Sequence, residues 1–157
     1  FVLSMASKGT TIFVGTSGGV QRSTDSGTTW SVINAGLTNP NVYALHVSGS
    51  IVFAGTSGGG VFRSTDDGSN WEQVVNGLTN NSVFTITSVS DGLGDTNLFC
   101  GTFGGGVFRS TDKGDNWSAV NNGLGILFVG ALTSSGSNLF AGGPVNGAFV
   151  STDAGEI

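Results

Sequence analysis

The feature that most constrains the fold is a pattern of eight or nine residues that returns along the chain at a nearly constant interval. It reads RSTDSGTTW at 22–30, RSTDDGSNW at 63–71 and RSTDKGDNW at 109–117, and a fourth copy, VSTDAGEI, covers 150–157. The aspartates of the four copies are 41, 46 and 41 residues apart. A repeat of about 40–45 residues is typical of a propeller blade made of four strands. The chain therefore reads as an array of four similar units.

Each unit contains short segments that favour β-strands. The second unit begins with NVYALHVSG, where apolar and small or polar residues alternate, and continues with SIVFAGT, GVFRSTD and NWEQVVNG. Gly, Ser, Asn and Asp bound these segments, as expected for hairpin turns. No segment repeats apolar residues at helical spacing over three turns. We therefore expect an all-β chain of propeller blades, each a four-stranded antiparallel sheet with strands of about five to seven residues.

The repeat divides the single propeller segment into blades at 1–41, 42–82, 83–128 and 129–157. The last unit stops one residue before the position of its tryptophan, so about 3.75 blades are expected and the last blade lacks its fourth strand. Propellers typically close with four to eight blades. We expect either an incomplete propeller within a larger array, or completion and self-assembly when another copy adds a strand along the open edge at 148–152.

The repeated residues resemble the Asp-box, also called the BNR repeat, which is written Ser/Thr-x-Asp-x-Gly-x-x-Trp/Phe. Asp-boxes occur in sialidases and in many secreted bacterial repeat proteins, and the resemblance covers the whole chain at the level of the blade. It implies that each box lies between the third and fourth strands, on the propeller face opposite the usual binding face. The matching positions are Ser23, Asp25, Gly27, Trp30, Ser64, Asp66, Gly68, Trp71, Ser110, Asp112, Gly114, Trp117, Ser151, Asp153 and Gly155.

The chemistry of the box residues itself predicts a structural role. A serine and an aspartate in a tight turn accept hydrogen bonds from nearby backbone N–H groups, and the glycine adopts positive φ without strain. The tryptophan then begins the fourth strand, and we expect it to be buried between blades with its indole N–H bonded at the turn. The box aspartates are thus predicted to hold turns rather than to transfer protons.

Three arginines suggest a different chemistry, because Arg22, Arg63 and Arg109 stand three residues before the box aspartates. Guanidinium groups bind carboxylates well, and sialidases clamp their ligand with an arginine triad. Side chains in equivalent positions of successive blades point in rotated directions, however, so a local ion pair or stacking contact is the expected role. The only tyrosine, Tyr43, also has no glutamate near it in the sequence.

A glycoside hydrolase needs two carboxylates about 5–10 Å apart. Seven of the ten acidic residues lie in box turns, which leaves Glu72, Asp91 and Asp95. The connections expected on the binding face read GTSGG, GTSGGG, GTFGGG, GGPVNG, GLTNPN, GLTNNS and GLGILF, and they contain no acid or base. We predict a noncatalytic scaffold without a cofactor. The alternative is a fragment of a sialidase-like or other glycoside hydrolase whose catalytic residues lie outside this chain.

The expected binding-face connections offer polar and aromatic side chains for a protein or glycan partner, namely Ser17, Asn39, Asn80, Asn81 and Phe103. A five-residue insertion in the third unit brings Asp91 and Asp95, whose oxygens a calcium ion could use. A longer polar hairpin explains the insertion equally well, and we expect no metal site.

Composition excludes some classes of partner. A net charge of −5, from five basic and ten acidic residues, leaves no basic surface for nucleic acid. No apolar stretch reaches the 18 residues that indicate a membrane span. Few lysines together with many Ser, Thr, Asn and Gly residues favour a secreted or extracellular protein, although the chain shows no signal peptide.

Overall fold

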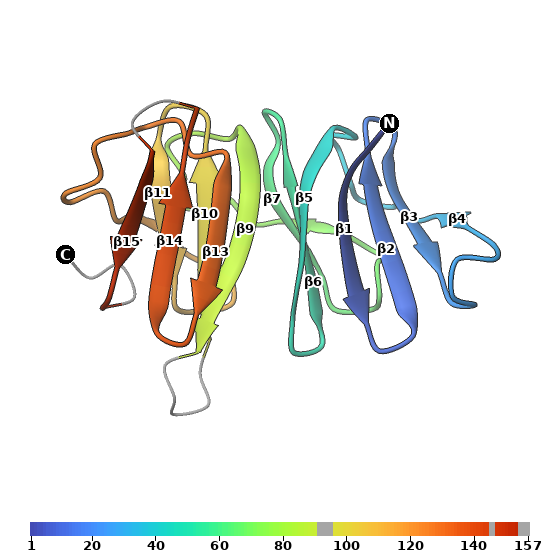
Figure 1. Ribbon diagram of the computed structural model, residues 1–157. Helices are drawn as coiled ribbons and strands as arrows, with labels where there is room; N and C mark the ends of the chain where they lie inside the picture. Colours follow the sequence, from blue (N-terminus) through green and yellow to red (C-terminus); the bar gives the residue numbers. More distant parts are fainter. Residues whose placement is uncertain (91–95, 145–146, 154–157) are drawn as a thin grey trace.

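The computed structural model describes residues 1–90, 96–144 and 147–153, which form four antiparallel sheets (Figure 1). The first sheet contains β1 (Val2–Lys8), β2 (Thr11–Thr16), β3 (Gly19–Ser23) and β4 (Ser31–Val32). The second contains β5 (Val42–Ser48), β6 (Ile51–Thr56), β7 (Gly60–Ser64) and β8 (Glu72–Gln73). The third contains β9 (Val83–Ser90), β10 (Thr96–Thr102), β11 (Gly106–Ser110) and β12 (Ser118–Ala119). The fourth contains β13 (Ala131–Ser135), β14 (Asn138–Gly142) and β15 (Ala148–Ser151).

Each sheet is a simple meander in which every strand pairs with the next one along the chain. The register repeats between sheets, since Phe13, Phe53 and Phe99 of the second strands lie opposite Arg22, Arg63 and Arg109 of the third strands. The first strands β1, β5, β9 and β13 lie side by side and connect the sheets (Figure 1). This is the arrangement of propeller blades, and the predicted all-β propeller fold is confirmed.

Three apolar cores fill the spaces between successive sheets. The second strands contribute most, because the run IVFAGT of β6 is buried on both faces, as expected for a strand covered by sheets on either side. Phe13, Phe53 and Phe99 are at most 1% exposed, whereas Phe140 in the last sheet is 36% exposed. Burial of the repeated phenylalanine thus depends on a neighbouring sheet rather than on the sequence of its own strand.

The fourth strands differ from the prediction of five to seven residues, since β4, β8 and β12 have two residues each. In two of the sheets, an asparagine side chain accepts the hydrogen bond that a longer fourth strand would otherwise accept from the third strand. The Val20 N–H donates to Asn34 Oδ1 at 2.8 Å, and the Val107 N–H donates to Asn121 Oδ1 at 2.7 Å. Because the side chain satisfies the backbone of the third strand, the main chain can leave the sheet early and cross to the next one.

Candidate functional site

The repeated Ser-x-Asp-x-Gly turns lie at the end of the sheets between the third and fourth strands, which we call the motif end. In the second copy Ser64 Oγ donates to Asp66 Oδ1 at 2.8 Å and accepts the Gly68 N–H at 2.8 Å. The Asn70 N–H and its side-chain amide donate to the two carboxylate oxygens of Asp66, both at 2.8 Å. The first and third copies repeat these contacts around Asp25 and Asp112. Each aspartate therefore closes a turn through local hydrogen bonds.

The backbone of these turns holds one feature that the sequence prediction missed. Gly68 adopts positive φ as expected, but Asp67 before it also does, at 57°. Ser26 and Lys113 occupy the same left-handed conformation in the other copies, at 59° and 61°. Residues other than glycine are rare in this region, and here the hydrogen bonds to the box serine and aspartate hold them there.

The hydrogen bonds also decide the charge of the box aspartates. The side-chain hydrogen bond from Thr29 lowers the pKa of Asp25 to about 2, and that from Asn70 lowers the pKa of Asp66 to about 2. The pKa of Asp112 is lowered as well, chiefly by Asn116. A general acid needs a pKa near the working pH, so these carboxylates are poorly suited to donate a proton near neutrality.

The box tryptophans bond differently from the expectation. Trp71 and Trp117 are 5% exposed, and their indole N–H groups donate to carbonyls of the preceding sheet rather than to their own turn. The acceptors are Ile33 at 2.7 Å and Val74 at 3.1 Å. Only Trp30 bonds at its own turn, to the Gly27 carbonyl at 3.1 Å, and it is 40% exposed because none of the described sheets packs against that side of the first sheet. The tryptophan thus joins two blades wherever a preceding blade exists.

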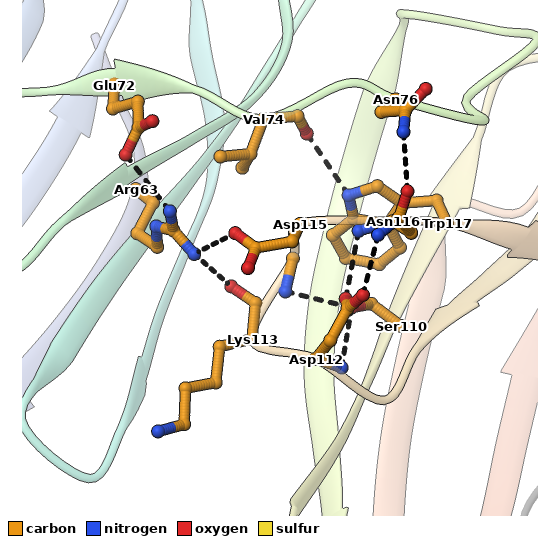
Figure 2. A network of polar contacts seen from close by, with 11 residues as sticks. Arg63, Glu72, Val74, Asn76, Ser110, Asp112, Lys113, Asp115, Asn116 and Trp117 are labelled. Carbon is orange, nitrogen blue, oxygen red and sulfur yellow. Dashed lines mark hydrogen bonds and ion pairs between the residues drawn. The ribbon is translucent and has the colours of Figure 1, made fainter.

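The arginines of the third strands also connect neighbouring blades. Arg22 donates to the Asp67 carbonyl at 2.7 Å, and Arg63 donates to the Lys113 carbonyl at 3.0 Å, so each reaches the next box turn. Arg63 further pairs with Asp115 at 2.7 Å and with Glu72 at 3.0 Å (Figure 2). Burial opposes its charge, but these two carboxylates outweigh that and raise the pKa of Arg63. Arg22 and Arg63 therefore each serve a separate turn and do not form one ligand clamp.

The fourth copy of the motif is described only up to Asp153. Ser151 Oγ donates to Asp153 Oδ1 at 2.6 Å, as in the other copies. Gly155 lies outside the described residues, and so do the calcium candidates Asp91 and Asp95. Among the residues that the structure describes, no three His, Cys, Asp or Glu side chains gather to hold a metal ion.

The opposite end of the sheets, which we call the rim, contains the connections between second and third strands and those that enter the first strands. Four aromatic side chains of the rim pack together. Phe84 contacts Tyr43, Phe103 and Phe128 with ring centroids 4.6, 6.0 and 5.7 Å apart, and Phe103 lies 4.7 Å from Phe128. Tyr43 remains 36% exposed and Phe103 56% exposed. These four residues form the aromatic cluster, in which Phe84 and Phe128 are partly buried.

A β-bulge explains why two of these rings point to the rim. Strand β5 pairs Val42 with Thr56 and Ala44 with Gly55, so Tyr43 is the extra residue of a bulge. Phe84 holds the same place in β9. A bulge re-aims its side chain away from the regular alternation of the strand. Sequence reasoning found Phe103 but missed Tyr43, Phe84 and Phe128 as contact residues. A large aromatic residue directly after Val83 breaks the alternation and could have signalled the bulge.

The polar residues predicted as partner contacts divide into two groups. Asn39 and Asn80 hold the rim turns, since their side-chain amides donate to the carbonyls of Ser57 at 3.0 Å and Phe103 at 2.8 Å. Ser17 and Asn81 are exposed on the rim. The side-chain amides of Asn39 and Asn80 thus stabilise the turns of the rim.

No charged side chain belongs to the rim connections in the sequence. The segments 16–20, 33–42, 56–60, 74–83, 102–106, 120–130 and 142–147 contain no Lys, Arg, Asp or Glu. Lys8, by contrast, pairs with Asp67 at the motif end. The site thus combines exposed aromatic rings with uncharged amide, hydroxyl and backbone groups, which suits an uncharged ligand better than an ionic one.

Comparison with known proteins supports the fold. No family model matches the chain, and a search of curated proteins by sequence finds no match either. Among solved structures, a GH74 enzyme of Niastella koreensis matches 95% of this chain with a TM-score of 0.68 and 24% identity. YCF48 bound to D1 peptide matches 89% with a TM-score of 0.67 and 19% identity, and the computationally designed Ika4 protein matches 98% with a TM-score of 0.70 and 13% identity.

This chain matches less than half of two of these proteins, so those matches support the fold and not an activity. The chain spans 28% of the Niastella koreensis enzyme and 47% of YCF48, but 91% of Ika4. The described part of the chain also contains no helix that could cross a membrane. The comparisons and the sheets agree that this chain consists of β-propeller blades.

Proposed function

We propose that this chain is a noncatalytic segment of an extracellular propeller of the Asp-box type, and that its rim binds a partner through the aromatic cluster. The preferred partner is an uncharged glycan. Exposed aromatic rings offer flat apolar faces on which a sugar ring can stack, and clustered apolar surface on a soluble protein marks an interaction site. The observation that carries the proposal is the aromatic cluster on a rim without charged residues.

The noncatalytic part of the proposal rests on where the acids lie. Asp25, Asp66 and Asp112 are held as carboxylates by their turns. Glu72 and Asp115 pair with Arg63 on the outer part of the blades. The described rim therefore lacks the pair of carboxylates that hydrolysis of a glycoside requires.

The rim also has the rigidity that a binding surface needs. Backbone N–H groups of Gly58 and Gly60 both donate to the Asn81 carbonyl, at 3.0 and 2.8 Å. Gly104 and Gly106 donate in the same way to the Leu127 carbonyl, both at 2.9 Å. Each turn is thus tied to the connection that leads to the next sheet, which fixes the rim backbone before a ligand arrives.

A panel of immobilised neutral and acidic oligosaccharides tests this function. We expect the chain to be retained by neutral glycans, and we expect Phe103→Ala to abolish retention. Val32→Ala is the matched control, because Val32 is also exposed, at 67%, but belongs to the outer strand β4. Absence of retention on every neutral glycan, or equal retention of Phe103→Ala and the parent chain, would refute the glycan proposal and leave a protein as the partner to be sought.

The alternative function is that of a glycoside hydrolase fragment with catalytic residues outside this chain. It predicts that a longer chain carries acidic residues in the rim connections of further blades. Hydrolysis of a neutral polysaccharide by such a longer chain, and not by residues 1–157 alone, would favour the alternative over a binding scaffold.

A further inference from the structure

At the motif end, a lysine connects the first sheet to the second. Lys8 Nζ pairs with Asp67 Oδ1 at 2.5 Å and donates to the Ser50 carbonyl at 3.1 Å. Lys8 is the last residue of β1, Ser50 lies in the turn between β5 and β6, and Asp67 follows the box aspartate of the second sheet. One long cationic side chain thus bridges two sheets and is neutralised by a carboxylate.

The same three positions between the second and third sheets carry different side chains, namely Ser48, Thr96 and Lys113. Ser48 is the last residue of β5, as Lys8 is of β1. Lys113 follows the box aspartate with φ of 61°, close to 57° at Asp67. A short hydroxyl side chain therefore replaces the bridging lysine, and an ammonium group replaces the carboxylate.

A pocket of about 270 Å³ lies at these positions between the second and third sheets. Phe53, which is 1% exposed, belongs to its apolar lining. Its polar lining comprises Ser48, Ser50, Thr96, Thr111 and Lys113. Pockets for drug-sized ligands have volumes of about 300–1,000 Å³, so this one suits a ligand of about one sugar ring.

The charge of Lys113 indicates what kind of ligand fits. Figure 2 shows its side chain extending away from Arg63 and Asp115, while its carbonyl accepts the hydrogen bond from Arg63. Among the described residues, no carboxylate pairs with its ammonium group. An ammonium group beside several hydroxyl groups favours an anion with oxygen atoms. A single positive charge complements one carboxylate better than a doubly charged phosphate.

We propose that this pocket binds a carboxylate of monosaccharide size, such as a hexuronate. The ligand carboxylate pairs with Lys113, which repeats the pairing of Lys8 with Asp67 in reversed polarity. The hydroxyl groups of Ser48 and Thr96 exchange hydrogen bonds with the hydroxyl groups of the sugar. This site lies at the motif end, so it stands or falls independently of glycan binding at the rim.

Titration of the ¹⁵N-labelled 157-residue chain with sodium glucuronate, followed by amide NMR shifts, tests the proposal. We expect saturable shifts at Gly49 and Lys113, and none with glucose. Lys113→Ser should weaken binding at least about tenfold. The turn tolerates serine, because Ser26 holds this position in the first copy with φ of 59°. Lys8→Ser is the matched control, since it removes a lysine of the neighbouring interface and should leave the affinity unchanged.

A charge-reversed variant provides a second test. Ser48→Lys combined with Lys113→Asp copies the pair of the first interface, so it should fill the pocket and abolish binding. Urea unfolding establishes that every variant folds before affinities are compared. Equal shifts with glucose, tighter binding of inorganic phosphate than of glucuronate, or equal affinity of Lys113→Ser and the parent chain would overturn the proposal.

Discussion

The two ends of the sheets use aromatic residues in opposite ways. At the motif end Trp71 and Trp117 are 5% exposed and bond to the preceding blade. At the rim Tyr43 and Phe103 are 36% and 56% exposed, and each contacts another aromatic ring. The same class of side chain therefore serves blade assembly at one end and remains available to a partner at the other.

Charge follows the same division. Carboxylates at the motif end are held by turns or by Arg63, while the rim connections contain no charged residue. Conserving the pattern in every blade is what assembly of similar units requires, and a rim that varies between blades is what recognition requires. The motif end thus repeats its residues for structure, whereas the rim adds Phe103 and Phe128 at positions where the first two units have Ser or Asn.

The largest expected effect comes from removing a buried motif-end tryptophan. Trp71→Ala should lower the free energy of unfolding by about 3–5 kcal/mol, because the cavity lies between two blades. Trp30→Ala should cost about half as much, since a side chain that is 40% exposed loses less buried area. Urea unfolding followed by circular dichroism measures both. Equal losses would mean that the preceding blade contributes nothing to the role of the tryptophan.

Much of the fold and of the motif end could be predicted from the sequence. The interval between Asp25 and Asp66 predicts the blade, and alternation and turn residues predict its four strands, although not the shortness of the fourth. The structural role of the box aspartates follows from turn chemistry alone. These features are local or periodic, so a single chain displays them without any comparison.

The remaining features depend on contacts between blades, which a sequence does not display. The short fourth strands arise because Asn34 and Asn121 replace backbone partners, and the indole bonds of Trp71 and Trp117 reach carbonyls about 40 residues away. The aromatic cluster depends on bulges and on three different connections meeting at one end. All of these features depend on which distant residues the fold brings together.

A smaller loss of stability is expected when acid protonates the aspartates of the motif end. The pKa values of Asp25 and Asp66 are about 2 in the folded chain and 3.8 ordinarily. The stabilisation that they provide is therefore complete above about pH 4 and is lost as the pH falls toward 2. Both carboxylates are exposed to solvent, so we expect this loss to be smaller than that caused by Trp71→Ala.

Urea midpoints measured between pH 5 and pH 2 test this prediction. Asp66→Asn provides the comparison, because an amide keeps the size of the side chain but does not titrate. The variant should be less stable than the parent at pH 5, and the difference should narrow toward pH 2. A constant difference across this range would show that the hydrogen bonds of Asp66 do not depend on its charge.

The smallest effect on stability is expected at the rim. Phe103→Ala removes a ring that is 56% exposed and lies 4.7 Å from Phe128, so the loss should be about 1 kcal/mol or less. The same substitution should nonetheless remove glycan retention, which Trp30→Ala should leave intact. A variant that loses binding while keeping its urea midpoint separates recognition from folding. If Phe103→Ala instead unfolded the chain as strongly as Trp71→Ala, the aromatic cluster would be a fourth core, and the contrast between the two ends would fail.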